Sequence, residues 1–182
     1  MELTDYSPLG NNNEAKEWEN KAKTLIKKLY KHSWNGERFI AKLSSTHDYV
    51  ENQTSLLEVM PLVLGDLLDK DKFEKLVNIL EKDYLTENGP ATEMLKSELY
   101  ESDGYWRGPI WAPSTYLLVD GLKRGGREDL AKRIASGFCN MVQNKAKGNF
   151  ENFDAITGQG LRAPGYTWTA SVFMLLLWEY LT

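Results

Sequence analysis

Residues 113–144 read PSTYLLVDGLKRGGREDLAKRIASGFCNMVQN, and this stretch decides the fold class. Apolar residues recur at every third or fourth position on both sides of Gly125-Gly126, which is the spacing of an amphipathic helix. A glycine pair ends a helix readily, because glycine adopts left-handed backbone conformations without strain. The stretch therefore predicts two helices, over about residues 113–124 and 128–144, joined by a tight turn.

The same periodicity predicts four more helices in the rest of the chain, over about residues 14–32, 53–69, 72–84 and 167–181. Pro61 should kink or divide the helix over 53–69, since proline has no backbone N–H. Residues 34–43 contain the turn signal Asn35-Gly36 and predict at most a short strand or hairpin arm. Candidate N-terminal caps are Asn11, Asn12 or Asn13, then Asn52 or Thr54, and finally Thr167 or Thr169. The sequence thus predicts one all-α domain spanning residues 1–182, built from paired helices.

Composition and charge exclude several classes of protein. The 182 residues are 42% hydrophobic and 26% charged, and the net charge of −4 is spread along the chain, unlike a nucleic-acid-binding surface. The most apolar run, residues 172–177, is far shorter than the roughly 20 residues of a membrane span. No basic segment followed by an apolar run begins the chain, so we expect a cytoplasmic location with neither nucleic acid nor membrane as a partner.

The chain has one cysteine, Cys139, which excludes an internal disulfide framework. It lies in an apolar helical stretch beside Phe138 and Met141, so we expect a small core residue rather than a nucleophile. We predict neither a metal ion nor a cofactor.

Two long loops, over about residues 85–108 and 147–165, carry the residues that suggest chemistry. The first ends in YWRGPIW, residues 105–111. Flat aromatic faces suit the C–H faces of sugar rings, and the five N–H donors of Arg107 suit a carboxylate or sugar hydroxyls. Trp106 and Trp111 could equally pack in the core while Arg107 pairs with a buried acid, so both interpretations stand.

The second loop contains NFENFD, residues 149–154, followed by TGQG, residues 157–160. Glu151 lies between aromatic residues on a glycine-rich loop, where a partly dry cleft could tune its pKa. It is a candidate catalytic base, with a structural acid as the alternative. Asp154, in an Asp-x-x-Thr-Gly context, should be the more exposed of the two acids and should form a turn or cap. Trp168, in the stretch 164–171, PGYTWTAS, lies at the mouth of the last predicted helix.

Four stretches, in their order along the chain, resemble one group of enzymes. The stretches are GPATEM (residues 89–94), YWRGPIW, ENFD-x-x-TGQG and GYTWTAS. The enzymes are the inverting glycoside hydrolases with an (α/α)6 toroid: the processing α-glucosidases that act on mannosyl-oligosaccharides, the mannosylglycerate hydrolase-like proteins and the trehalases. The resemblance spans nearly the whole chain and matches their C-terminal part. It implies that the six helices form about half of a toroid, and that the substrate is an oligosaccharide or small glycoside, such as an α-glucoside.

The resemblance also implies roles for individual residues. Glu151 matches the general base, which deprotonates the attacking water. The residues that match the family's substrate-binding positions are Tyr105, Trp106, Arg107, Trp111 and Trp168. The family's general acid is an aspartic acid that lies before the matching part begins, so no acid is carried over. Asp103 is the nearest candidate, but the family gives it no such role and a turn function is expected. The chain alone is therefore expected to be inactive, because losing general acid catalysis costs about 10²–10⁴-fold in rate.

Half a toroid leaves a large apolar surface uncovered, and such surfaces mark interaction sites. The chain could be a piece of a longer protein, could pair with a separately encoded N-terminal half, or could associate with a second copy of itself. We therefore expect self-association or a complementary N-terminal half. The missing acid also leaves a second function open, namely a non-catalytic helical module that binds carbohydrate or another protein through the same aromatic loops.

Overall fold

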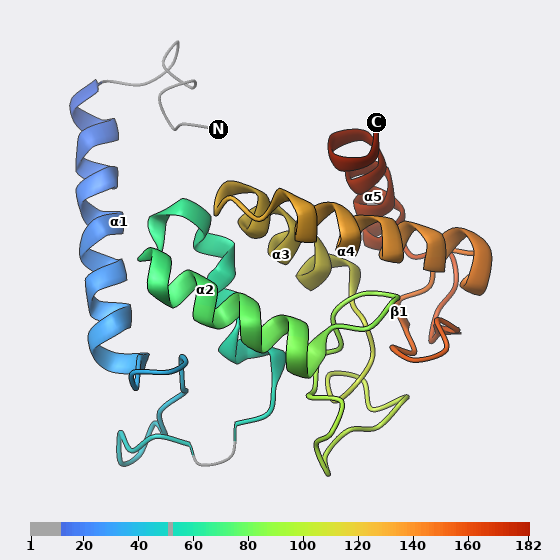
Figure 1. Ribbon diagram of the computed structural model, residues 1–182, viewed down its shortest axis with the longest axis horizontal. Coiled ribbons are helices and arrows are strands. Elements are labelled where there is room, and N and C mark those ends of the chain that lie inside the picture. The colour runs from blue at the N-terminus through green and yellow to red at the C-terminus, as the bar shows by residue number, and fades with distance from the viewer. Residues whose placement is uncertain (1–11, 51–52) are drawn as a thin grey trace.

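The computed structural model describes residues 12–50 and 53–182, and it is predominantly helical, as predicted (Figure 1). The central pair is α3 (Ala112–Arg124) and α4 (Glu128–Asn140), joined at the glycine pair. Their facing residues are fully or almost fully buried: Leu118, Val119 and Leu122 on α3, with Leu130, Ala131 and Ile134 on α4. The local periodicity of residues 113–144 therefore identified the hairpin at the centre of the fold.

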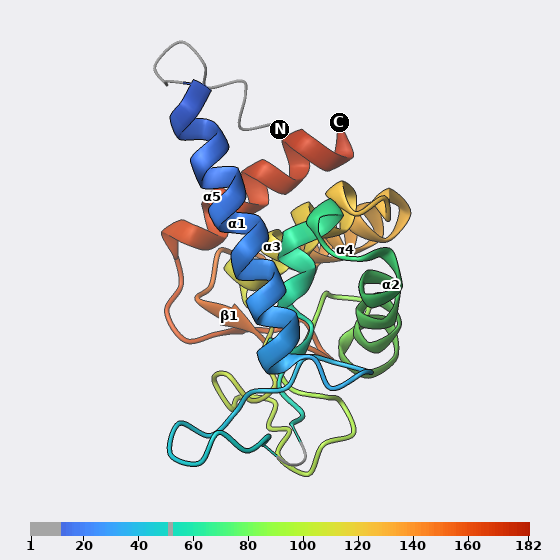
Figure 2. The same cartoon turned by 90° about the vertical axis from the view of Figure 1, so that its left-hand side faces the viewer.

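Four further helical segments match the predicted ranges closely. These are α1 (Asn12–Ser33), α2 (Lys70–Ile79) with the π-helical turn η4 (Leu80–Tyr84), and α5 (Thr167–Leu176) with the π-helical turn η6 (Leu177–Leu181). The fourth is the π-helical turn η5 (Met141–Ala146), which continues α4. Three of the helices thus end in a wider final turn. In Figure 1, α1 lies along one edge of the molecule, and α5 with the C-terminus lies away from it, beyond α3 and α4; in Figure 2, α1 faces the viewer.

The segment over residues 53–69 does not form the predicted α-helix, although it is divided next to Pro61, as expected. The segment forms two short 3-10 helices, η2 (Leu56–Glu58) and η3 (Met60–Leu67). Pro61 stands at the start of η3, and Gly65 adopts a φ of +56°, so the α-helical hydrogen-bond ladder cannot run through. The segment instead packs against α3, where Gly121 leaves no room for a side chain: a Cβ there would lie 2.1 Å from the carbonyl oxygen of Leu62.

The caps predicted for the segments over residues 53–69 and 167–181 differ from the observed ones. Asn11 and Asn52 lie outside the described residues, and Asn12 and Asn13 already belong to α1. Ser55, rather than Thr54, caps η2 by accepting a hydrogen bond from the Leu57 amide. Tyr166 is the N-cap of α5 and makes no side-chain capping bond. The expectation for Thr167 or Thr169 was therefore wrong, and the buried Thr169 instead donates to the Phe150 carbonyl over 2.6 Å, which ties α5 to the Glu151 loop.

Strand structure is confined to short pieces. The hairpin arm expected over residues 34–43 consists of isolated bridges, Trp34 with Phe39 and Lys42 with Tyr49. The two-stranded antiparallel sheet of β1 (Asn152–Phe153) and β2 (Gly160–Leu161) lies in the second long loop. Phe153 of β1 also bridges Ile110 at the end of the first long loop, so the two loops meet.

Two carboxylates, those of Glu58 and Glu93, and the single thiol are buried among the described residues. Glu58 is fully buried and accepts hydrogen bonds from the Tyr84 hydroxyl (2.6 Å) and from Arg38 (3.1 Å). Burial raises the pKa of Glu58, while these two donors counteract the rise. Cys139 is buried, as predicted, and burial raises the pKa of its thiol to about 11, so it stays protonated at neutral pH.

None of the helices described between residues 12 and 182 combines the length and the apolar character that crossing a membrane requires.

Candidate active site

The site forms where the two long loops are joined. The backbones of Ile110 and Phe153 exchange two hydrogen bonds, with N–O distances of 2.7 and 3.0 Å. Phe153 lies fully buried against Phe138 of α4, which fixes the second loop on the helical layer. The pairing brings the YWRGPIW stretch next to the Glu151 loop.

An aromatic cluster occupies this junction and consists of Tyr105, Trp106, Trp111 and Trp168. Trp111 is fully buried at its centre, and the Trp106 ring stacks on it at 4.1 Å with an interplanar angle of 6°. The Tyr105 and Trp168 rings meet Trp111 edge-on, at centroid distances of 4.8 and 5.6 Å. The Trp111 indole also donates to the Tyr105 carbonyl over 2.9 Å. Trp111 therefore supports the cluster from the core, while Trp106 and Trp168 keep exposed ring surface.

Glu151 lies at the edge of this cluster, half-buried. Its Oε1 accepts a hydrogen bond from the Tyr105 hydroxyl over 3.3 Å. Its backbone is held on both sides, because the amide donates to the Ala163 carbonyl (3.0 Å) and the carbonyl accepts from the Trp168 indole (3.3 Å). Within the part of the chain that the structure describes, Tyr105 is the only hydrogen-bond partner of the carboxylate, so Oε2 is left for another donor.

The Tyr105 hydroxyl is a donor at neutral pH. Burial raises its pKa, and the negative charge and hydrogen bond of Glu151 raise it further, because a phenolate beside a carboxylate is unfavourable. The arrangement thus presents a carboxylate with one oxygen held by a neutral phenol.

Arg107, which the resemblance assigns to substrate binding, contacts Glu101 and not Glu151. Residues 101–107 fold back on themselves, with the Glu101 amide donating to the Arg107 carbonyl over 2.7 Å. The turn brings the Arg107 guanidinium to 2.7 Å from the Glu101 carboxylate, in a solvent-exposed ion pair. The alternative in which Arg107 pairs with a buried acid is not observed, because the Glu101 carboxylate is exposed, and its substrate-binding role stays a prediction. The cation that lies over Tyr105 is Arg162, which the sequence did not single out.

Asp154 forms a turn, as predicted, and it is not a free acid. Its Oδ1 accepts from the backbone amides of Ile156 (2.8 Å) and Thr157 (2.7 Å). The expected difference in exposure is not observed, because Asp154 and Glu151 are both half-buried. The Asp154 side chain thus shapes the β1–β2 hairpin that follows Glu151.

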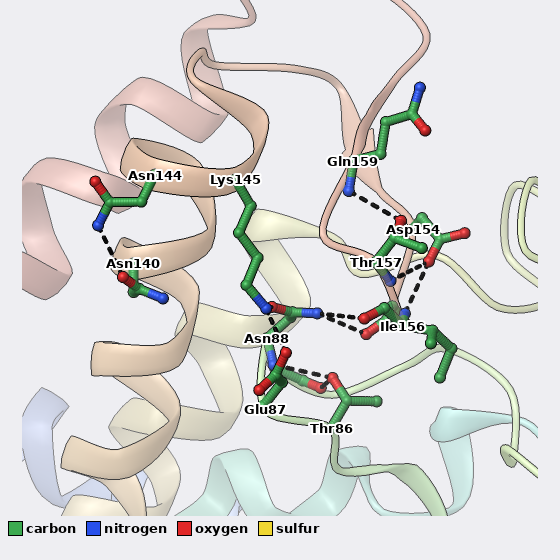
Figure 3. A network of polar contacts seen from close by, with 12 residues as sticks. Thr86, Glu87, Asn88, Asn140, Asn144, Lys145, Asp154, Ile156, Thr157 and Gln159 are labelled. Carbon is green, nitrogen blue, oxygen red and sulfur yellow. Dashed lines mark hydrogen bonds and ion pairs between the residues drawn. The ribbon is translucent and has the colours of Figure 1, made fainter.

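Asn88 anchors this hairpin to the rest of the domain (Figure 3). The buried Asn88 amide donates to the carbonyls of Ala155 and Ile156, each over 3.0 Å, and its Oδ1 accepts from Lys145 over 2.7 Å. Lys145 comes from η5 and also pairs with Glu87. The network links η5, the turn at residues 86–89 and the Glu151 loop, and sequence reasoning did not single out Asn88 or Lys145.

Replacing Asn88 by Ala should therefore loosen the loop. We expect the loss of about 1–3 kcal/mol from the free energy of unfolding, because one buried and one partly buried carbonyl lose their donor. Amide hydrogen exchange at residues 155–158 should also speed up. Asn144→Ala is the matched control, because Asn144 bonds only the exposed Asn140 side chain. Equal losses in the two variants, measured by urea unfolding, would contradict the anchoring role.

Two apolar hollows flank the exposed rings of the cluster. One has a volume of about 870 Å³ and is lined by Trp168 together with residues of α3 and α5. The other, of about 400 Å³, is lined by Trp106 together with residues of η2, η3 and α3. They share Pro113 and Leu117, so apolar surface continues across α3 from one tryptophan to the other. Within residues 12–50 and 53–182, no group of His, Cys, Asp or Glu side chains is arranged to hold a metal ion.

Comparisons with known proteins agree with this geometry. A family model described as "Mannosylglycerate hydrolase MGH1-like glycoside hydrolase domain" matches residues 7–169. Mannosylglycerate hydrolase MGH1 of Selaginella moellendorffii is 36% identical over 83 residues, which are 46% of this chain and 16% of that protein.

Among solved structures, the GH63 mannosylglycerate hydrolase of Thermus thermophilus in complex with glucose has a TM-score of 0.71 at 21% identity, over 93% of this chain and 41% of that one. Neutral trehalase Nth1 of Saccharomyces cerevisiae has a TM-score of 0.74 at 22% identity, over 92% of this chain and 31% of that one. The chain thus has the fold of part of an (α/α)6-toroid protein, as predicted, and spans less than half the length of these relatives.

Proposed function

Because the chain belongs to the mannosylglycerate hydrolase MGH1-like glycoside hydrolase family, we propose that it supplies the general base, Glu151, for hydrolysis of a glycosidic bond with inversion. One observation carries the proposal. The Glu151 carboxylate is held beside partly exposed aromatic rings, with Oε1 bound by Tyr105 and Oε2 without a partner among the described residues.

In the proposed reaction, Glu151 takes a proton from a water molecule. That water attacks the anomeric carbon on the face opposite the leaving group, and a second carboxyl group protonates the leaving oxygen. An inverting pair of carboxyl groups lies roughly 6.5–9.5 Å apart, which leaves room for the water. Tyr105 keeps Oε1 occupied, so that Oε2 can receive the proton.

The two long loops carry one aspartate each, Asp103 and Asp154, and we propose that neither supplies the acid. The Asp103 carboxylate pairs with Arg162, and Asp154 Oδ1 accepts two backbone hydrogen bonds. We propose that the acid comes from the part of the toroid that the relatives have and this chain does not span. The chain alone should then be inactive, since it lacks both the acid and half of the substrate-positioning surface.

The proposed substrate is an α-glucoside or a related small sugar. Partly exposed tryptophan rings, such as Trp106 and Trp168, can pack against the apolar C–H faces of a sugar ring. The names of relatives refer to mannosylglycerate and to trehalose, which supports a small sugar as the substrate.

The test is a hydrolysis assay of the chain together with the segment that completes its toroid. Mannosylglycerate, trehalose and a glucosylated mannosyl-oligosaccharide would serve as substrates. Release of hexose from at least one supports the proposal. The alternative function, a non-catalytic carbohydrate-binding module, is favoured by the absence of an unengaged aspartate beside Glu151 among the described residues. If calorimetry detects binding of these sugars and the assay detects no hydrolysis, the result would support that alternative.

The partner that we propose for this chain is the complementary helical part of the toroid, packed on the outer face of α5 and η6. The inner residues Val172, Leu176 and Tyr180 are buried on the side of α3 and α4. The outer face exposes five large apolar residues: Met174, Leu175, Leu177, Trp178 and Leu181. The matched structures are more than twice as long as this chain. Their additional length supports a further helical layer as the partner that covers this outer face.

Without its partner, the chain should self-associate through the outer face of α5 and η6. Trp178→Glu should reduce the association measured by light scattering, because it places a charge on the most exposed residue of this face. Ile156→Glu is the control, since Ile156 is an exposed apolar residue on the Glu151 loop, outside this face. A wild-type chain that stays monomeric at high concentration would count against the prediction.

A further inference from the structure

Arg162 connects the two long loops from the β2 side. Its Nη2 donates to the Asp103 carbonyl over 3.0 Å and lies 2.8 Å from the Asp103 carboxylate. The two residues are 59 positions apart in the sequence, one on each loop. The contact therefore fixes the first loop relative to the loop that carries Glu151.

The same guanidinium lies over the Tyr105 ring. The distance from Arg162 Cζ to the ring centroid is 5.5 Å, which is within the range of a cation–π contact. Asp103 precedes Tyr105 by two residues, so Arg162 holds both the ring of Tyr105 and the backbone that leads into it. From this position the Tyr105 hydroxyl reaches Glu151.

The backbone at both contact points is unusual. Tyr105 has a φ of +62° and Arg162 a φ of +65°, in the left-handed region that residues with a side chain seldom adopt. Such conformations persist where surrounding contacts hold them, and they often occur at functional sites. Here the two strained residues contact one another across the junction of the loops.

We propose that Arg162 and Asp103 form a latch that positions Tyr105, and through Tyr105 the carboxylate of Glu151, with one oxygen occupied and the other directed at the attacking water. This inference rests on the proposed role of Glu151. Arg162 and Asp103 are positioning residues, since neither contacts the Glu151 carboxylate.

The latch supplies a restraint that the rest of the site does not. The aromatic cluster holds the backbone of Tyr105 through its carbonyl, but the remaining hydrogen bonds of Glu151 involve only its backbone. If Tyr105 swings away, the Glu151 carboxylate is free to rotate about its last side-chain bond. A base that rotates spends less time aligned with the water, which lowers the rate without removing the base.

The test follows the titration of the Tyr105 phenol by NMR of the full chain labelled at tyrosine Cζ. In the wild type, Glu151→Gln should lower the pKa of Tyr105 toward the ordinary value of about 10, because the neighbouring negative charge is removed. Arg162→Ala should also lower this pKa, because the released ring leaves Glu151. In the Arg162→Ala variant, a further Glu151→Gln substitution should then leave the pKa of Tyr105 unchanged.

If Arg162 acted only through its charge, Arg162→Ala would shift the pKa of Tyr105 in the opposite direction. Removing a nearby cation that favours the phenolate would raise the pKa of Tyr105, and the response to Glu151→Gln would persist. That result would overturn the latch. Arg162→Lys should restore the wild-type titration, since an ammonium group can still reach Asp103. Arg133→Ala, which breaks an exposed ion pair with Glu81 on another part of the surface, should leave the titration unchanged.

A kinetic measurement on the complete enzyme separates this inference from the proposed function. Arg162→Ala should lower kcat by about 10²-fold with little change in KM, because the base is displaced and not removed. An unchanged kcat in a variant that has lost the tyrosine response would overturn the positioning role. If Glu151→Gln keeps full turnover, the proposed function fails, whatever the titration of Tyr105 shows.

Discussion

Replacing Glu151 by Gln should lower hydrolysis by the complete enzyme by about 10²–10⁴-fold and leave the fold unchanged. Glutamine has nearly the same shape, and its amide oxygen can still accept from the Tyr105 hydroxyl. The two backbone hydrogen bonds of residue 151 are also retained. The variant loses only the capacity to take a proton from water, so its urea unfolding curve should match that of the wild type.

Asp154→Asn is the matched control for this prediction. Asp154 lies three residues along the same loop, and an asparagine there can still accept from the amides of Ile156 and Thr157. We expect it to keep most of the turnover. Equal losses in the two variants would indicate damage to the loop, and full activity of Glu151→Gln would reject the base.

Replacing Trp111 by Ala should lower the free energy of unfolding by about 3–5 kcal/mol, as for other large aromatic residues in cores. Trp111 is fully buried, supports the stacked Trp106 ring, and donates to the Tyr105 carbonyl. An alanine would leave a cavity directly under the site and an unpaired carbonyl beside it.

Trp178→Ala removes the same side chain from a position that is 79% exposed on η6. For the isolated chain we expect a change within about 0.5 kcal/mol, since little surface is buried there. Urea unfolding of both variants measures the difference. Comparable destabilisation by the two substitutions would contradict the assignment of Trp111 to the core.

The helices could be predicted wherever local signals agreed. Residues 113–144 combine a clear helical period with a glycine pair, and both α3 and α4 begin and end close to the predicted residues. The segment 53–69 has apolar residues but also contains Pro61 and Gly65. Its shape depends on the close approach of Gly121 from α3. This is a tertiary contact, which the spacing of apolar residues in the sequence does not indicate.

Local sequence signals identify some residues of the candidate site and miss others. The aromatic stretch and the Glu151 loop carry their own composition signals, and the structure brings them together. The position of Arg107 depends on a tight turn that directs it to Glu101, and its residue type alone does not indicate this turn. Asn88 and Arg162 act across 67 and 59 residues, and nothing local distinguishes them from surface residues.

The anomeric configuration of the first product tests the central claim most directly. Proton NMR would follow hydrolysis of an α-glucoside by the complete enzyme, before the released sugar equilibrates. If Glu151 activates a water that attacks opposite the leaving group, β-glucose appears first. If α-glucose appears first, the reaction retains configuration, and the role of Glu151 as base of an inverting hydrolase is contradicted.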